Sequence, residues 1–465
     1  MKAARGVLLV ALALLGIAAL RDFARLGEAF PWRQLYDFPD FYCAGSALDR
    51  SADPYRYEPL HRCEHAVNVG PAYRKDPRRV VPAPLPPYDF PPLMLAARLS
   101  FPIARTVGAL AIVAALLAAT LGLALVAVPL DVAALALALP AGYVLLNAGQ
   151  VVPFALVALI FCGVALARRR DNLAGIFAAL SLIEPHLGLP VCAAVLCWVS
   201  RARLSLLATA LVLAGVGAAT VGLLGTAEYV ARVLPAQAAA ETAYVYQYSL
   251  TYLLRTAGVP PGPALIAGDV SYAAMLGLGV WLGRRVAQTL GHRELIAYLP
   301  GACSLIGGPY VHMVDLSFAI PATLVLTGTL QGRPRNVAVV ALCLLAVPWI
   351  LVWITKKLFL ATVFVVAVLL LRLRTERAVT VGTLASIATS IYALELAPPA
   401  ALVATTVGSF AANDLAQQAW HAYVTQLGSG SVTWLLVKVP TWAALIAMLA
   451  ASLAALRAKR VPVLQ

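Results

Sequence analysis

Residues 105–127 read RTVGALAIVAALLAATLGLALVA, an apolar stretch with a single charge at its first position. At about 1.5 Å per helical residue, such a stretch can cross the ~30 Å hydrocarbon core of a bilayer. Similar stretches recur along the 465-residue chain, which is 62% hydrophobic and only 12% charged. Soluble domains carry about 25% charged residues. The sequence therefore predicts an all-α, polytopic membrane protein whose backbone groups are satisfied within helices.

The order of the apolar stretches predicts about twelve spans in one integral membrane domain, residues 1–465, without a soluble domain. We expect these spans near residues 6–20, 105–127, 131–147, 151–167, 204–224, 263–282, 294–310, 314–330, 336–353, 358–373, 379–397 and 432–455. Basic clusters separate many of them, at residues 168–170, 201–203, 284–285, 333–335, 372–377 and 457–460. The clusters share one side of the membrane, which the positive-inside rule makes cytoplasmic. The net charge of +14 is thus spread over many turns, so we expect no nucleic-acid partner.

This topology predicts that both termini are cytoplasmic and that Arg74 faces the other side of an inner or plasma membrane. An impermeant thiol reagent applied to intact cells is expected to label a cysteine introduced at position 74 and not one introduced at position 169. The protein without an introduced cysteine serves as the control, because it shows how much label the native cysteines take up. A reactive site at 169 together with an unreactive site at 74 would overturn the topology.

Residues 171–200 do not fit a simple span, because basic clusters flank them on both sides. The stretch is broken at Glu184-Pro185, and proline ends or kinks a helix. One interpretation is a re-entrant hairpin of two half-length helices; the other is one tilted helix beside a neighbour with different limits. Glu184 and His186 would lie at the tip of the hairpin. Ionisable side chains within a membrane are costly and often functional, but these two also suit pairing with each other.

The only long polar segment covers residues 21–104, which this topology places outside the cytoplasm. Its acidic cluster, Asp37-Phe38-Pro39-Asp40, is flanked by aromatic residues, which favour the membrane interface. A carboxylate held there and partly desolvated is suited to act as a general base. The alternative is a solvated loop carboxylate or a helix cap.

Cys43 and Cys63 are the two cysteines of this polar segment, and the other five lie in apolar stretches. An extracytoplasmic compartment permits oxidation, so we expect a disulfide between them; two free thiols are the alternative. The chain has no Cys-x-x-Cys pair, no other metal-binding spacing, and no Walker or Rossmann glycine motif. We therefore expect no structural metal, no cofactor and no nucleotide-sugar donor.

Six sequence blocks follow in a fixed order along the chain. The first block is Asp37-Phe38-x-x-Phe41-Tyr42-Cys43-Ala44-Gly45, followed by Asp53-Pro54-Tyr55. The later blocks are Tyr88-Asp89-Phe90-Pro91-Pro92-Leu93, Gly149-Gln150, Leu173-Ala174-Gly175 through Glu184-Pro185, Tyr248-Ser249-Leu250, and Pro309-x-x-His312. Together these blocks, over roughly residues 30 to 320, resemble glycosyltransferase family 87. Two positions depart from its pattern: Glu184 stands where the family commonly has Lys, and residues 307–310 replace a serine-rich run.

The resemblance implies a GT-C type membrane enzyme that moves a sugar, often mannose, from a polyprenyl-phosphate donor to a glycan or glycolipid acceptor. It implies inversion by direct displacement, with Asp37 as the general base and Asp40 as the second candidate. His312 would donate to the phosphate or to the sugar. The other expected substrate-binding residues are Tyr42, Tyr88, Gln150, Glu184, His186, Ser249 and Arg255. Further candidates for the phosphate are Arg74, Lys75, Arg78 and Arg79, which also suit a solvated loop.

Two other functions stay open at this level. One is a transporter or flippase of lipid-linked or small polar substrates, although the chain lacks two related halves with matching Gly/Pro-broken helices. The other is an inactive family member, because Glu184 replaces the family's Lys. Sugar transfer from a defined lipid donor distinguishes the three functions.

Overall fold

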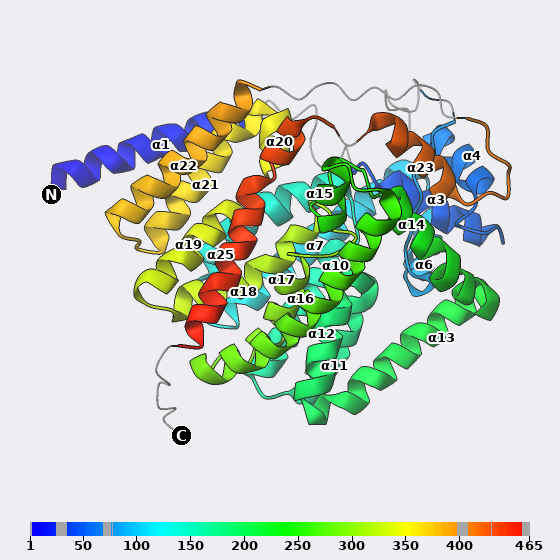
Figure 1. Cartoon of the computed structure of the whole chain (residues 1–465), viewed down its shortest axis with the longest axis horizontal. Helices are drawn as coiled ribbons and strands as arrows, with labels where there is room; N and C mark the ends of the chain where they lie inside the picture. The colour runs from blue at the N-terminus through cyan, green and yellow to red at the C-terminus, as the bar shows by residue number, and fades with distance from the viewer. Residues whose placement is uncertain are drawn as a thin grey trace.

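The computed structural model describes residues 2–24, 35–67, 76, 78–397, 408–428 and 430–457. Within these ranges the chain is all-α: helices are joined by turns and no strand is present (Figure 1). The helices of the main bundle are α7 (Phe101–Ala124), α8 (Leu130–Leu137), α9 (Val144–Ala148), α10 (Val152–Ala167), α11 (Asp171–Leu180), α12 (Pro185–Trp198), α13 (Arg203–Glu228), α16 (Pro261–Leu290), α17 (Leu295–Ser304), α18 (Ala319–Thr329), α19 (Gly332–Leu345), α20 (Trp349–Ile354), α21 (Phe359–Arg372), α22 (Arg377–Glu395) and α25 (Val439–Ala455). The others are α1 (Lys2–Ala24), α3 (Phe38–Asp49), α4 (Tyr57–Val67), α6 (Phe90–Ala97), α14 (Leu234–Ala240), α15 (Leu250–Thr256), α23 (Ala416–Leu427) and α24 (Val432–Leu436).

Six helical stretches in the described part of the chain are long and apolar enough to cross a membrane. They are Phe101–Ala124, Leu130–Ala148, Ser200–Ala240, Pro261–Leu290, Arg377–Glu395 and Val432–Ala455. The chain is therefore a helical membrane protein, as the composition predicts. The other six expected spans fall on α1, α10, α17, α18, α19 with α20, and α21. The total of about twelve spans and the GT-C architecture stay predictions.

Three short helices, α10, α17 and α18, lie inside the bundle, and most of their side chains are buried. Gly163 of α10 permits this close packing, because a Cβ there would lie 2.2 Å from the ring of Tyr298 on α17. The Tyr298 hydroxyl donates a hydrogen bond to the carbonyl of Ile160 at 2.9 Å. A side chain at position 163 would separate α10 from α17.

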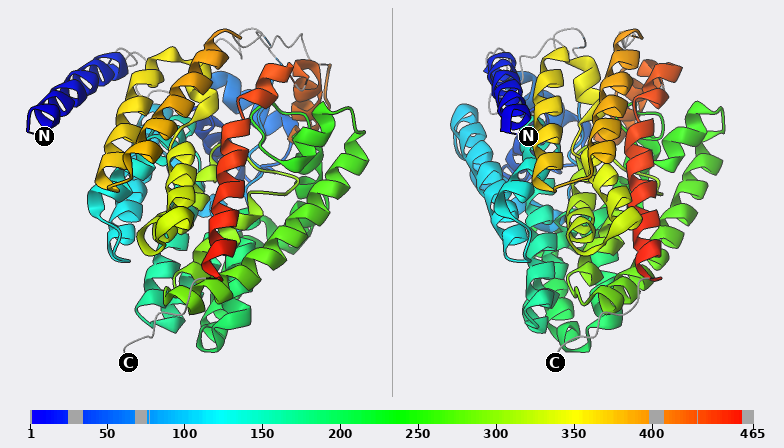
Figure 2. Two further views of the ribbon diagram at one scale, coloured as in Figure 1. Left: turned by 60° about the vertical axis from the view of Figure 1, so that its left-hand side comes forward. Right: turned by 90° about the vertical axis from the view of Figure 1, so that its left-hand side faces the viewer.

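The outer helices carry the apolar surface that faces away from the protein. On α13, Leu204, Leu211 and Leu224 are 81%, 74% and 88% exposed, as expected for side chains in contact with lipid. α13 runs obliquely away from the body of the bundle in Figure 1. At the opposite edge, α1 projects from the body (Figure 2) and packs on α21. Gly16 of α1 faces the ring of Phe364 on α21.

The helical stretch that contains α13 runs from Ser200 to Ala240, and its 41 residues would rise about 60 Å, twice the thickness of the hydrocarbon core. Gly222 interrupts this stretch with φ 80° and ψ 165°, a backbone conformation that favours glycine. The break divides the stretch into two segments. The segment before Gly222 is long enough to cross a membrane, and the segment after it ends with α14.

The polar segment 21–104 is folded rather than a loop over the residues described. Its helices α3, α4 and α6 share an apolar core with residues of α7, the π-helical turn Tyr229–Val233 and α23. Leu35, Leu60 and Phe90 are fully buried in that core. α3, α4 and α23 lie together at the upper right of Figure 1, away from the connection between α12 and α13. Arg74 and Lys75 lie outside the described residues.

Cys43 of α3 and Cys63 of α4 form a disulfide in the structure, with their Cα atoms 5.5 Å apart. The bond closes a loop over a separation of 20 residues. Chain-entropy arguments give such a closure about 3 kcal/mol of stabilisation. We expect the double substitution Cys43→Ala, Cys63→Ala to lower the thermal midpoint of the detergent-solubilised protein, and unreduced wild type to resist alkylation at both positions. Mass spectra with both cysteines alkylated before reduction would contradict the disulfide.

The stretch 171–200 consists of two short helices, α11 and α12, joined by a 3-10 turn at Ser181–Ile183. The break lies at Glu184, whose backbone is extended with φ −116° and ψ 94°, directly before Pro185. Gly188 lets the first turn of α12 approach this turn, because a Cβ there would lie 2.4 Å from the carbonyl of Ser181. The helix break is where the sequence predicts it; a re-entrant path through the membrane stays a prediction.

Candidate active site

Asp37 is held at the start of α3 by the backbone of a different helix end. Its N–H donates to the carbonyl of Ala148 at 2.8 Å, and the N–H of Tyr36 donates to Asn147 at 3.1 Å. Gly149 ends α9 with φ 75°, and a Cβ at this residue would lie 2.9 Å from the Leu35 Cβ. The turn after α9 therefore requires glycine both for its conformation and for the close approach of the segment that carries Asp37.

Gln150 follows this turn and is the hydrogen-bond partner of the acid. Its Nε2 donates to Asp37 Oδ2 at 2.5 Å. Burial raises the pKa of Asp37, whereas the hydrogen bond from Gln150 and the nearby His312 act to lower the pKa. The sequence predicted Asp37 and Gln150 as separate site residues, and the structure joins them.

His312 lies between α17 and α18 and contacts a buried acid that the sequence reading missed. Its Nε2 is 3.3 Å from Oε2 of Glu241, the residue that ends α14. Burial acts to lower the pKa of His312, but the hydrogen bond and the charge of Glu241 outweigh this effect, so the pKa is raised. The imidazolium form of His312 is thus favoured close to Asp37, whose charge also acts on the ring.

Glu241 is 3% exposed and accepts hydrogen bonds from three further side chains. The donors are Gln237 Nε2 at 3.2 Å, Gln247 Nε2 at 3.3 Å, and the indole of Trp420 on α23. Gln247 also accepts the N–H of Val311 at 2.8 Å, which fixes the chain just before His312. These donors hold the Glu241 side chain in place against the imidazole of His312.

A second acid, Asp315, connects His312 to the helix break at Glu184. Its Oδ2 accepts the N–H of His312 at 2.6 Å and lies 3.2 Å from Nε2 of His186. The other ring nitrogen of His186 is 3.6 Å from Glu184 Oε2. The ring of Tyr310 lies between the two histidines, stacked on His312 with centroids 4.4 Å apart. Glu184 and His186 do pair, but as part of a network that reaches His312.

Tyr88 and Asp89 extend this polar region toward α6. The Tyr88 hydroxyl donates to the carbonyl of Leu182 at 2.6 Å, in the turn that precedes Glu184. One carboxylate oxygen of Asp89 is buried without a hydrogen-bond partner among the described residues. Burial and the nearby charge of Glu184 raise the pKa of Asp89. This carboxyl group is suited to bind a hydroxyl group of a ligand.

Arg79 supplies a positive charge to the same region, since its charge acts on the Asp37 carboxyl group. Its guanidinium donates to the Tyr423 hydroxyl at 2.7 Å and lies over the Tyr423 ring, 4.4 Å from the centroid. The aromatic contacts orient the side chain. Arg79 is a described member of the expected basic run, and its placement near Asp37 suits a phosphate.

Four expected site residues have other contacts. Asp40 is buried in the first turn of α3. The Tyr42 hydroxyl donates to the Leu99 carbonyl at 2.9 Å, between α6 and α7. Ser249 caps α15 by accepting the N–H of Tyr252 at 3.2 Å, and Arg255 donates to the carbonyl of Val259 at 2.6 Å. These contacts position helices, and the structure does not join the last three side chains to the network around His312.

No group of three or more His, Cys, Asp and Glu side chains within the described ranges is arranged to hold a metal ion. Comparison of the chain with protein-family models, with curated proteins and with solved structures gives no match. The geometry of this site and the motif resemblance are therefore the two indications of function.

Proposed function

We propose that the protein is an inverting glycosyltransferase that moves a sugar, mannose-like, from a polyprenyl-phosphate donor to a glycan or glycolipid acceptor. The observation that carries the proposal is the partly buried Asp37 carboxyl group, which accepts a hydrogen bond from Gln150 and interacts electrostatically with His312. A base and a cation side by side are what direct displacement of a phosphate from a sugar requires.

In the proposed reaction, the oxygen of the acceptor hydroxyl group forms a bond to the anomeric carbon of the donor sugar. Asp37 accepts the proton of this hydroxyl group as the bond forms. The bond from that carbon to the phosphate oxygen breaks, and the polyprenyl phosphate leaves with the electron pair. His312 in its imidazolium form and Arg79 balance the charge that develops on the phosphate. Inversion follows because one displacement occurs at the anomeric carbon.

The remaining polar groups of the site bind the sugar in this reaction. Glu184, His186 and Asp89 offer acceptors and donors for hydroxyl groups, and Tyr88 holds the turn beside them. The enzyme then acts from an inner or plasma membrane with the site on the extracytoplasmic face, in contact with membrane lipids. The proposal includes no cofactor and no nucleic acid.

The decisive experiment is transfer by the purified protein in detergent from radiolabelled polyprenyl-phosphate sugars to glycolipid acceptors. We expect a product with inverted anomeric configuration and one equivalent of free polyprenyl phosphate. Proteoliposomes that move an intact lipid-linked sugar across the bilayer, without cleaving it, would instead support a flippase. A protein that neither cleaves nor moves any donor of a broad panel would be an inactive relative.

A further inference from the structure

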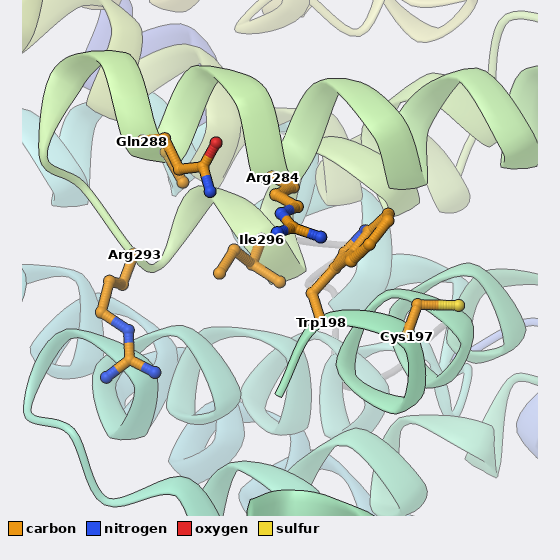
Figure 3. Close-up of a pocket in the computed structure, with 7 residues that line it drawn as sticks. Cys197, Trp198, Arg284, Gln288, Arg293 and Ile296 are labelled. Carbon is orange, nitrogen blue, oxygen red and sulfur yellow. The ribbon is translucent and has the colours of Figure 1, made fainter. Parts of the chain in front are cut away.

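A second site candidate lies at the far end of α12. A cleft of about 350 Å³ opens between the end of α12, the end of α16 and the start of α17, and Trp198, Arg284, Gln288, Arg293 and Ile296 line it (Figure 3). α12 rises about 20 Å from Pro185 to Trp198, so this cleft is distinct from the polar network at Glu184. None of its lining residues belongs to the proposed transferase site.

The cleft is rich in positive charge. The guanidinium of Arg284 stacks over the Trp198 ring, 4.2 Å from the centroid, and makes no ion pair with any described residue. Arg293 donates to Asp171 at 3.0 Å, so one carboxylate partly offsets its charge. Further exposed arginines lie near these elements in the sequence, at positions 168, 169, 170, 201, 203 and 285. Glu294, next to Arg293 in the sequence, is buried and pairs with His292 at 2.7 Å. Arginines thus outnumber carboxylates here, so an anion in the cleft meets a positive potential.

The cleft also borders an apolar surface. Trp198 donates its indole N–H to the carbonyl of Val280 at 2.8 Å, and its ring remains 36% exposed. Beside it, Leu196 and Trp281 are 39% and 43% exposed. Exposed tryptophan rings next to arginines are typical of the depth at which lipid headgroups lie. The cleft thus offers a charged base and an apolar rim to one ligand.

We propose that this cleft binds the phosphate group of an anionic phospholipid from the arginine-rich side of the membrane. Arg284 presents its N–H donors to the phosphate while Trp198 holds the guanidinium plane. The amide of Gln288 and the guanidinium of Arg293 supply further donors, and the acyl chains lie along the exposed apolar rim. Free phosphate is also an anion but lacks acyl chains, so it would make only the polar contacts of this site.

Native mass spectrometry of the full-length protein in detergent tests this proposal by titration with phosphatidylglycerol or with phosphatidylcholine of the same chains. We expect tighter binding of phosphatidylglycerol by wild type. Arg284→Gln should weaken that binding about tenfold, the loss typical of a hydrogen bond to a charged group. Phosphatidylcholine should lose less, because the positive charge of its choline group offsets the charge of its phosphate. Arg285→Gln is the matched control, because Arg285 is exposed on the same helix but does not line the cleft.

Arg284→Lys keeps the charge and loses the planar fork, so an intermediate loss is expected even if the glutamine variant folds poorly. Equal affinities for the two lipids, or equal loss in the Arg284→Gln and Arg285→Gln variants, would overturn the proposal. A third arm adds inorganic phosphate at constant ionic strength. Displacement of phosphatidylglycerol by millimolar phosphate would overturn the lipid as the source and assign the cleft to a soluble phosphate.

Discussion

Replacing Asp37 by asparagine is expected to lower sugar transfer by about 10²- to 10⁴-fold, the usual cost of losing a general base. The change should leave the fold intact, because Asn retains an oxygen that can accept the hydrogen bond from Gln150. The backbone bonds from Asp37 to Ala148 and from Tyr36 to Asn147 do not depend on the Asp37 side chain. Initial rates of transfer, measured beside the thermal midpoint, separate catalysis from stability.

Asp40→Asn is the matched control for this prediction. Asp40 is an acid of the same helix turn and is buried, whereas Asp37 is partly buried, so both substitutions replace one carboxyl group at the start of α3 by an amide. Near-normal turnover in Asp37→Asn together with an inactive Asp40→Asn would show that Asp40 is the base. Near-normal turnover in both variants would remove the acidic cluster from the mechanism.

The second large effect is expected for Glu241→Gln. The substitution keeps the shape of the side chain and an acceptor for Trp420, but it removes the charge that faces His312. Hydrogen bonds to charged groups contribute about 1.5–3 kcal/mol, so transfer should fall about ten- to hundredfold. Glu228→Gln is the control, since Glu228 belongs to the same helical stretch but pairs with Arg56 and Arg232. Equal losses in the two variants would contradict a specific role of Glu241.

The pH dependence of transfer gives a further test of the same contact. Asp37 acts as a base when deprotonated and burial raises its pKa, so activity should fall on the acidic side at a pH above the usual aspartate value of about 4. His312 acts when protonated and its pKa is raised, so activity should fall on the alkaline side above about 6.5. Glu241→Gln should move the alkaline limb to lower pH, because the Glu241 contacts raise the pKa of His312. The acidic limb should also move to lower pH, since the Glu241 charge acts to raise the pKa of Asp37. An unchanged alkaline limb would exclude His312 as the titrating cation.

The sequence indicated the helices well because apolar stretches depend on local composition. Each of the twelve expected spans overlaps one or two α-helices, and six of these helical stretches are long and apolar enough to cross a membrane. α17 ends at Ser304, before Gly307 and Gly308, and is shorter than expected. The polar segment was harder to predict, because its fold depends on contacts between distant residues. Leu35 packs on Gly149, and the first residues of α4 form backbone hydrogen bonds with the chain just before Leu415. No local sequence pattern indicates either contact.

The site was predicted where motifs mark it and missed where single residues complete it. Asp37, Gln150 and His312 belong to motif blocks, and the structure brings these blocks together. Glu241 follows a run of alanines and Asp315 lies in an apolar stretch, so neither carries a pattern. Their roles come from partners far along the chain, such as Trp420, which is 179 residues from Glu241. Arg79 could not be distinguished from its basic neighbours without its contact with Tyr423.

On the predicted topology, the break at Gly222 would set the depth of the candidate site relative to the bilayer surface. From Arg203 to Val221 the helix rises about 28 Å, close to the thickness of the hydrocarbon core, so a chain that starts at one lipid boundary reaches the other at Gly222. One turn and a half before the break, Gly217 packs on Pro87, next to Tyr88 and Asp89. These residues would then lie within a few ångströms of the outer boundary. A polyprenyl phosphate whose chain stays in the bilayer would present its phosphate and sugar at this level, without leaving the membrane to react.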